Sequence, residues 1–419
     1  MKKLLFLLFI ALISQPGFSS YILIPMDAEN QENHLKAYGI TYWVLDNGEK
    51  VNWLLNYRGG SFLMSDNQAT REECKIRGVS FETLSDKEAA SILEEISSPS
   101  KNEETVVLEK APKVAVYTPK GNPPWDDAVT MALTYAEIPY DKVYDKEVLD
   151  DELTAYDWLH LHHEDFTGQY GKFYGAYRST PWYIKQKKEA EELAKELGYD
   201  KVSDEKLAVA KKIKAYVVGG GFMFAMCSAT DSFDIALAAE DTDICEPMFD
   251  GDPSEPGYQK KLDFSKTFAF KDFTLEKDPT VYSFSSIDMT YKRNIPREED
   301  YFSLRTFSAK WDPIPTMLTQ NHTTLVKGFM GQTTAFDSRY IKSNVIIMGQ
   351  NQKAGEARYI HGNIGKGFFT FYSGHDPEDY AHRVGDAKTE LELHPTSPGY
   401  RLILNNLLFP AAKPKHHKT

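Results

Sequence analysis

A glycine break, a short apolar run and a single cysteine, in that order, constrain the fold of this chain more than any other feature. Apolar residues recur at helical spacing over 205–217, and the three glycines at 219–221 end that helix because glycine reverses the backbone freely. Residues 222–226 are all apolar, which is typical of a strand buried on both faces. Cys227 follows directly, so the segment predicts one helix–strand–helix step of an α/β sheet.

The position of Cys227 predicts a reactive thiol. Ser228 or Thr230 can cap a new helix that Asp231 begins. A cysteine at a strand-to-helix turn sees unpaired N–H groups and the positive end of the helix dipole, which favour the thiolate. We therefore expect Cys227 to be a nucleophile.

Length and charge limit the class of protein. The chain has 419 residues and a formal net charge of −13, enough for two or three domains and unfavourable for binding nucleic acid or an anionic membrane. Lys2 and Lys3 precede an apolar stretch at 4–13, and Gly17 and Ser19 suit a cleavage site. We expect a signal peptide over 1–20, export to the periplasm, the cell surface or the medium, and no stable membrane insertion after cleavage. An uncleaved anchor is the alternative.

The three cysteines do not form a disulfide framework. Cys74, Cys227 and Cys245 leave at least one thiol unpaired within the chain. The alternative to a reactive Cys227 is a Cys227–Cys245 disulfide, which would remove the nucleophile.

Turn signals and composition divide the chain into two folded units. Residues 41–45 and 50–55 predict a hairpin around Asp46-Asn47-Gly48, and Ser85 with Glu88 forms a capping box before a helix over 89–96. Strand-like runs alternate with helices from residue 113 onward, which predicts a parallel sheet. The expected organisation is a signal peptide (1–20), a small α+β domain (21–96), a polar linker (97–112), an α/β domain (113–410) with insertions at about 168–204 and 241–332, and a basic tail (411–419).

A base for Cys227 is predicted at the end of a late strand. Residues 367–372 form an apolar run that ends before His375, with Asp376 and Glu378 close behind. A carboxylate can orient the imidazole and favour its charged form. A purely structural His375, bonded to a loop carbonyl, is the alternative.

The densest cluster of polar side chains lies at the end of another predicted strand, over 156–163. It contains His160, His162, His163, Glu164 and Asp165. His160 and His162 share a face of a strand. We expect the cluster to line a substrate pocket without a metal or cofactor; a Zn²⁺ site is the minor alternative, since no standard zinc spacing is complete.

From Lys113 to Pro410 the order of strand, cysteine, helix and late strand with His and an acid resembles the class I glutamine amidotransferase-like superfamily. The resemblance implies a flavodoxin-like parallel sheet and a Cys-His-Glu triad that hydrolyses an amide through a thioester. It implies the catalytic residues Cys227, His375 and Glu378. The remaining pocket and oxyanion residues would be Gly220, Gly221, Ser228, His162, His163, Glu164, Asp165 and Asp376.

The whole chain also resembles exported Bacteroidetes proteins labelled "asparagine synthetase B", through residues 33–39, 53–62 and 374–378. It lacks the Ser-Gly-Gly-x-Asp-Ser loop that such a synthetase needs to bind ATP. We therefore expect an amide hydrolase acting on a small-molecule amide. Because Ala225 and Ala229 replace the usual elbow glycines, the alternative is a non-catalytic module of the same fold that binds a glycan or a cell-envelope partner.

Overall fold

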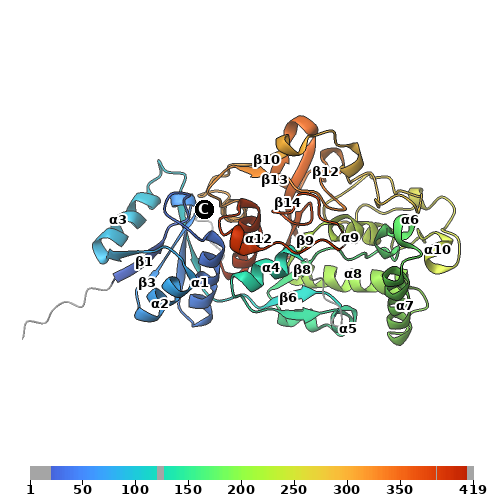
Figure 1. Cartoon of the computed structure of the whole chain (residues 1–419), viewed down its shortest axis with the longest axis horizontal. Helices are drawn as coiled ribbons and strands as arrows, with labels where there is room; N and C mark the ends of the chain where they lie inside the picture. The colour runs from blue at the N-terminus through green and yellow to red at the C-terminus, as the bar shows by residue number, and fades with distance from the viewer. Residues whose placement is uncertain (1–19, 120–126, 384, 413–419) are drawn as a thin grey trace, which may run out of the picture.

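The computed structural model describes residues 20–119, 127–383 and 385–412. It places a small unit built on one sheet beside a larger unit built on a second sheet (Figure 1). The larger sheet mixes parallel and antiparallel strands and carries helices on its faces, so the predicted α/β class is confirmed. The predicted signal peptide lies outside the described residues, apart from Ser20, which is the first residue of a strand.

The first unit is an antiparallel sheet with helices packed against it. Its strands run in the order β4-β1-β3-β2-β5. The strands are β1 (Ser20–Ile24), β2 (Val51–Leu55), β3 (Ser61–Ser65), β4 (Glu82–Ser85) and β5 (Glu104–Leu108), and the helices are α1 (His34–Asp46), α2 (Gln68–Arg77) and α3 (Asp86–Ser97). The capping box of Ser85 and Glu88 at the start of α3 is confirmed.

Two predictions for this unit are wrong. Residues 41–45 belong to α1 instead of a strand, because that helix is buried on nearly every side and shows no helical period in its sequence. Asp46-Asn47-Gly48 therefore ends a helix, with Gly48 in the left-handed region at φ 80°. The expected linker at 97–112 contains β5, which pairs with β2.

The second sheet has a parallel half and an antiparallel half that meet at one strand. Its order is β11-β10-β13-β14-β15-β9-β8-β6-β7, and β12 pairs with β14. The strands are β6 (Val114–Tyr117), β7 (Asp141–Val143), β8 (Trp158–Leu161), β9 (Phe222–Met226), β10 (Tyr301–Leu304), β11 (Leu325–Lys327), β12 (Phe336–Asp337), β13 (Ile346–Asn351), β14 (Glu356–Ile364) and β15 (Gly367–Tyr372). The strands from β15 to β7 are parallel. The predicted strands at 222–226 and 367–372 are β9 and β15, which pair with each other.

Alternate residues of the parallel strands face two separate hydrophobic layers. Trp158, Phe222 and Phe224 belong to one cluster, whereas Leu159 and Met223 belong to the other. The helices of this unit are α4 (Ala128–Tyr135), α5 (Asp145–Leu149), α6 (Tyr174–Tyr177), α7 (Pro181–Glu196), α8 (Val202–Gly219), α9 (Ala229–Ala238), α10 (Pro247–Asp250), α11 (Pro313–Leu318) and α12 (Pro398–Leu408). Helices α8 and α9 cover one face, and α4 with α12 cover the other, which gives three layers.

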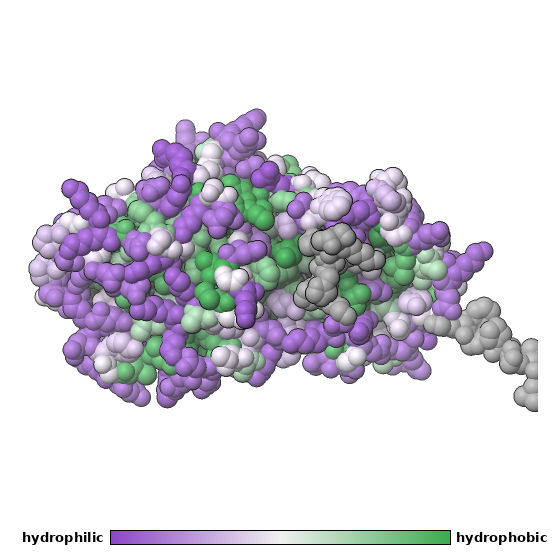
Figure 2. Space-filling view, turned by 180° about the vertical axis from the view of Figure 1, so that it is seen from behind, coloured by the Kyte–Doolittle hydropathy of each residue, from purple (hydrophilic) through white to green (hydrophobic). Residues whose placement is uncertain are grey.

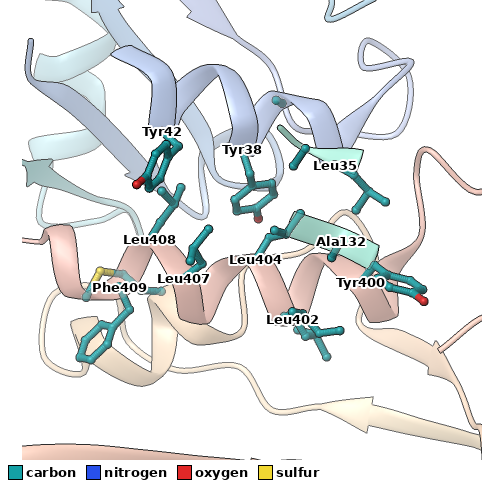
Figure 3. Packing of buried hydrophobic residues seen from close by; sticks show 14 of the residues in the cluster. Leu35, Tyr38, Tyr42, Ala132, Tyr400, Leu402, Leu404, Leu407, Leu408 and Phe409 are labelled. Atoms are coloured by element: carbon teal, nitrogen blue, oxygen red, sulfur yellow. The ribbon is translucent and has the colours of Figure 1, made fainter. Parts of the chain in front are cut away.

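The two units share a continuous core. Helix α1 of the first unit packs along α12 of the second, with Tyr38 and Leu404 among the side chains between them (Figure 3). The Tyr38 hydroxyl donates a hydrogen bond to the Asn405 side chain across this contact. A buried seam of this kind favours one fixed arrangement of the two units.

The exterior is mostly hydrophilic. Seen from behind, Figure 2 shows polar side chains over most of the surface, with smaller hydrophobic patches between them. Among the described residues, no helix has the length and apolar character required to cross a membrane.

Candidate active site

Cys227 occupies a strained turn at the end of β9, a parallel strand between β8 and β15. Strand β9 ends at Met226, helix α9 begins at Ala229, and Cys227 between them has φ 50°. The left-handed region costs a residue other than glycine about 1–3 kcal/mol, and such strain persists only where neighbouring contacts fix it. Here Ala229 N donates to His162 O at 3.0 Å, and Thr230 Oγ1 donates to Cys227 O at 2.6 Å. The Cys227 side chain is 3% exposed.

The sheet brings the two predicted histidine segments to the same edge as Cys227. Strand β9 lies between β8 and β15, with Leu161 opposite Ala225 and Tyr372 opposite Met226. All three strands are parallel, so the residues that follow them meet at the carboxyl edge. The predicted convergence of the segments that carry Cys227, His162 and His375 is therefore observed at the level of the backbone.

A tight turn directs His375 back over this edge. Gly374 has φ 86°, and a Cβ atom there would lie 2.5 Å from the Phe329 ring, so the position requires glycine. Gly374 N donates to Thr333 O at 2.8 Å, and His375 N donates to Met330 O at 2.9 Å. These bonds fix the backbone from which the His375 ring projects.

Thr333 links this turn to the helix behind Cys227. Its carbonyl accepts from Gly374 N, and its hydroxyl donates to Asp231 Oδ1 at 3.0 Å. Burial, together with the nearby charge of Asp288, raises the pKa of Asp231 well above its usual range. The two loops are thus tied together through a buried side chain that the sequence alone did not mark as part of the site.

A chain of contacts runs from Asp127 to His375 through His162. His162 Nε2 lies 3.0 Å from His375 Nδ1, and His162 Nδ1 lies 3.3 Å from Asp127 Oδ2. His160 Nε2 lies 3.1 Å from the same carboxylate oxygen, and its Nδ1 lies 3.2 Å from Phe224 O. His160 in β8 and His162 just after this strand therefore face the same carboxylate, in agreement with the shared face predicted for them.

Burial and charge act on these groups in opposite directions. Burial alone would raise the pKa of Asp127, but His160 and His162 beside it hold that pKa well below its usual range. Burial lowers the pKa of His162 and outweighs the attraction of Asp127. The site thus contains an ionised carboxylate with a neutral His162.

The hydrogen-bonding pattern assigns the protons on the rings. His160 faces an acceptor with each nitrogen, Phe224 O at Nδ1 and Asp127 Oδ2 at Nε2. His162 Nδ1 lies within ion-pair distance of Asp127 Oδ2, at 3.3 Å, but the contact lacks hydrogen-bond geometry. If the neutral ring rotates slightly and Nδ1 donates to Asp127, its Nε2 accepts the Nδ1 proton of His375. In that assignment the lone pair of His375 is on Nε2, which is the form a general base requires.

The acidic residues behind His375 have other partners. Glu378 makes an ion pair with His394 Nδ1 at 3.2 Å, and its backbone N–H donates to Asp376 Oδ1 at 2.9 Å. Asp376 Oδ2 accepts from the Thr389 hydroxyl at 2.7 Å. Among the described contacts, the carboxylate connected to His375 is Asp127 through His162, whereas Glu378 is engaged elsewhere.

Glu164 and Asp165 organise the loop after β8. Glu164 Oε2 accepts from His162 N at 3.1 Å, and burial raises the pKa of Glu164 to about 8. Asp165 accepts from Thr167 N at 2.7 Å and from Gly171 N at 2.9 Å. Both side chains support the backbone around His162 and His163, whose rings lie 5.0 Å apart.

Gly220 and Gly221 do not lie near Cys227, and the prediction that they line its pocket is wrong. They precede β9, whereas Cys227 follows it, so a strand of about 17 Å separates them. They line a cavity of about 1030 Å³ at the opposite edge of the sheet, with Trp311 and Phe409. Ser228, by contrast, is adjacent to Cys227 and buried at the start of α9.

All three thiols are free, so the alternative Cys227–Cys245 disulfide is wrong. Cys245 donates to Thr167 O at 3.2 Å. Burial raises the pKa of Cys74 to about 12 and raises that of Cys245 well above its usual range. These two cysteines are therefore expected to be inert as nucleophiles.

Sequence reasoning missed Asp127 as a member of the site. Its Oδ1 caps α4 by accepting from Thr130 N at 2.8 Å, while Oδ2 lies beside the histidines. His160 was predicted as part of the cluster, but its contact with Asp127 was not. The signal available in the sequence was an aspartate at the start of α4, next to the carboxyl edge of the sheet.

Comparisons with known proteins give no family. No protein-family model matches the chain, and no curated protein matches it. A cytoplasmic protein from Salmonella typhimurium is 11% identical with a TM-score of 0.35, over 72% of this chain and 100% of that one. A Thermoplasma acidophilum protein whose description places it with GMP synthase is 8% identical with a TM-score of 0.33, over 71% and 94%. Scores this low support no argument about fold or activity.

Proposed function

We propose that this protein is an exported amide hydrolase of the class I glutamine amidotransferase-like type, with Cys227 as its nucleophile. The observation that carries the proposal is the left-handed backbone of Cys227, φ 50°, at the end of the parallel strand β9. A strained strand-to-helix turn is the geometry that presents a catalytic nucleophile in α/β hydrolases. Strain of this kind is typical of functional sites.

The order of the parallel strands supports the same class. In chain order the strands are β6, β7, β8, β9 and β15, and in space they run β7-β6-β8-β9-β15. This arrangement, second-first-third-fourth-fifth, is that of flavodoxin-like sheets, whose ligands bind at the carboxyl edge. The antiparallel strands beyond β15 extend this sheet on one side.

In the proposed reaction, His375 Nε2 takes the proton of the Cys227 thiol. The thiolate attacks the amide carbon, and the tetrahedral intermediate collapses as the C–N bond breaks. His375 returns the proton to the leaving amine or ammonia, which leaves a thioester on Cys227. Water then loses a proton to Nε2 and attacks the thioester, and cleavage of the C–S bond releases the acid and regenerates the thiol.

His162 and Asp127 take the orienting role in this proposal. The carboxylate fixes the proton of His162, and His162 in turn fixes the tautomer of His375. This replaces the role that the resemblance assigns to Glu378, which pairs with His394. The substrate class is a small amide, and the net charge of −13 disfavours polyanionic ligands.

A small thiol-reactive probe tests the proposal. Near neutral pH, Cys227 should react at least about tenfold faster than Cys74 and Cys245, which serve as controls within the same chain. Cys227→Ser should abolish that labelling and any amide hydrolysis. A rate for Cys227 no faster than that of an ordinary thiol would refute the nucleophile.

The second candidate function is a binding module of the same fold without turnover. The side chain of Cys227 is only 3% exposed, which favours this alternative. Tyr170 and Tyr183 of the 168–204 insertion form a buried core with Phe249 of the longer insertion. The partly exposed Tyr174, Tyr177 and Trp182 pack against this core and are the rings that could stack on a glycan. Slow labelling of Cys227 combined with measurable glycan binding would support it.

A further inference from the structure

Three histidines converge at the edge of the sheet where Cys227 also lies, in a geometry that suits a transition metal. His162, His163 and His375 each offer a ring nitrogen, and these atoms all lie within 4.8 Å of one another. Two of the histidines follow β8 and the third follows β15, so the arrangement depends on the fold and no local sequence motif contains it. His162 and His375 are 1% and 8% exposed, so the ligand atoms are largely shielded from water.

We propose that His162, His163 and His375 form a binding site for Zn²⁺ or a similar divalent transition metal. Imidazole nitrogen is a preferred ligand for these ions, and three histidines with an open fourth position are a known type of zinc site. The proposal does not depend on the hydrolase activity inferred above.

The distances require little rearrangement at two of the ligands. Two nitrogens bound to one tetrahedral Zn²⁺ ion lie about 3.3 Å apart, given Zn–N bonds of about 2.05 Å. His162 Nε2 and His375 Nδ1 lie 3.0 Å apart, so the rings need to separate by only a few tenths of an ångström. His163 is half-buried in the loop beside them, and its ligand nitrogen lies within 4.8 Å of the other two.

Asp127 supplies the outer support that metal-bound histidines usually have. Its Oδ2 lies 3.3 Å from His162 Nδ1, which leaves Nε2 as the ligand atom and fixes the orientation of the ring. A carboxylate behind a metal-bound histidine is typical of zinc centres, and its loss commonly weakens metal binding 10–100-fold.

Metal binding and the base role of His375 exclude each other. A metal on His375 Nδ1 requires the tautomer whose proton is on Nε2, and a protonated Nε2 cannot accept the thiol proton. Zn²⁺ should therefore slow the reaction of Cys227 with a thiol probe. This consequence alone rests on the proposed function.

The test measures Co²⁺ and Zn²⁺ binding to the full chain purified without an affinity tag. His416 and His417 are first replaced by alanine, because the basic tail can bind metal by itself. We expect one equivalent of Co²⁺ with the visible spectrum of a tetrahedral site, displaced by Zn²⁺. His163→Ala and His375→Ala should each weaken binding about 100-fold, and Asp127→Asn about 10–100-fold.

His394→Gln is the matched control and should leave the affinity unchanged, since His394 pairs with Glu378 away from the cluster. His163→Ala changes a half-buried residue, so it keeps the test valid if His375→Ala fails to fold. A separate group that could hold a metal consists of Asp379, His382 and Asp386. The proposal would be overturned if no metal binds, or if His163→Ala leaves binding intact while His382→Ala removes it. Tight metal binding by a protein whose Cys227 is unreactive in the metal-free state would instead refute only the hydrolase.

Discussion

Two buried groups of histidines in this protein differ in the charge beside them. At the carboxyl edge of the larger sheet, His160 and His162 face the carboxylate of Asp127. Between the two units, His34 and His322 stack with their ring centroids 4.5 Å apart. Their charged neighbour is Arg401, whose Nη1 lies 3.1 Å from His322 Nδ1.

The difference separates a candidate site from a structural contact. Burial, reinforced by the charge of Arg401, lowers the pKa of His34 to about 3 and that of His322 to about 4, so both stay neutral. A carboxylate, by contrast, supports the charged form of a histidine and fixes its tautomer. Burial keeps His162 neutral just as it keeps His34 and His322 neutral. The difference is that a carboxylate beside the ring, unlike Arg401, can fix its tautomer and support a bound metal.

The largest effect is expected from Arg401→Met at the structural contact. Arg401 is fully buried and donates to Met26 O at 3.1 Å and to Gly59 O at 2.7 Å, across the seam between the units. Methionine fills much of the same volume but leaves Gly59 O without this donor. We expect the free energy of unfolding to fall by about 3 kcal/mol in chemical denaturation.

The control is Arg339→Met, at a side chain that is 75% exposed, which should lower the free energy of unfolding by less than about 1 kcal/mol. Equal losses would show that Arg401 does not hold the seam.

Asp127→Asn is expected to cost about 2 kcal/mol, because a hydrogen-bonded buried charge is lost while the amide oxygen still caps α4. In addition, the tautomer of His162 is no longer fixed, so labelling of Cys227 should slow by roughly tenfold. Asp157→Asn is the matched control: that carboxylate accepts from Lys113 N and pairs with exposed Lys110. A labelling rate unchanged by Asp127→Asn would remove Asp127 from the relay.

The sequence predicted the part of this site that depends on strand ends. Continuous apolar runs located β9 and β15, and their parallel pairing brings the segments of Cys227 and His375 together. The partners of each ring depend on side-chain contacts between residues distant in sequence, such as Asp127 with His162, which no periodicity encodes. The misassigned helix α1 follows the same logic, because tertiary burial on all sides removed its amphipathic pattern.

Acid should weaken the structural contact through His34. Its pKa is about 3 in the folded state and about 6.5 in the unfolded chain, so the unfolded state binds more protons between these values. Stability from this group is complete above pH 6.5 and is lost as the pH falls toward 3. His34→Phe keeps a ring that can stack on His322, and Arg401 still donates a hydrogen bond to Met26 O. The free energy of unfolding at pH 7.5 should therefore fall by about 1 kcal/mol. Denaturation at several pH values should give a shallower acid slope for His34→Phe. An unchanged slope would contradict the assignment.

Glu378→Gln should have the smallest effect and sharpens the comparison at the candidate site. Glu378 pairs with His394, which is 36% exposed, so losing the pair should change the free energy of unfolding by less than about 0.5 kcal/mol. If Asp127 orients His375 through His162, the labelling rate of Cys227 in Glu378→Gln should stay within about twofold of the original rate. A triad that used Glu378 as its third member would slow by tenfold or more. The labelling rates of Cys227 in Glu378→Gln and in Asp127→Asn, measured side by side, therefore decide which of these two carboxylates acts on His375. The two alternatives predict opposite rankings of these variants.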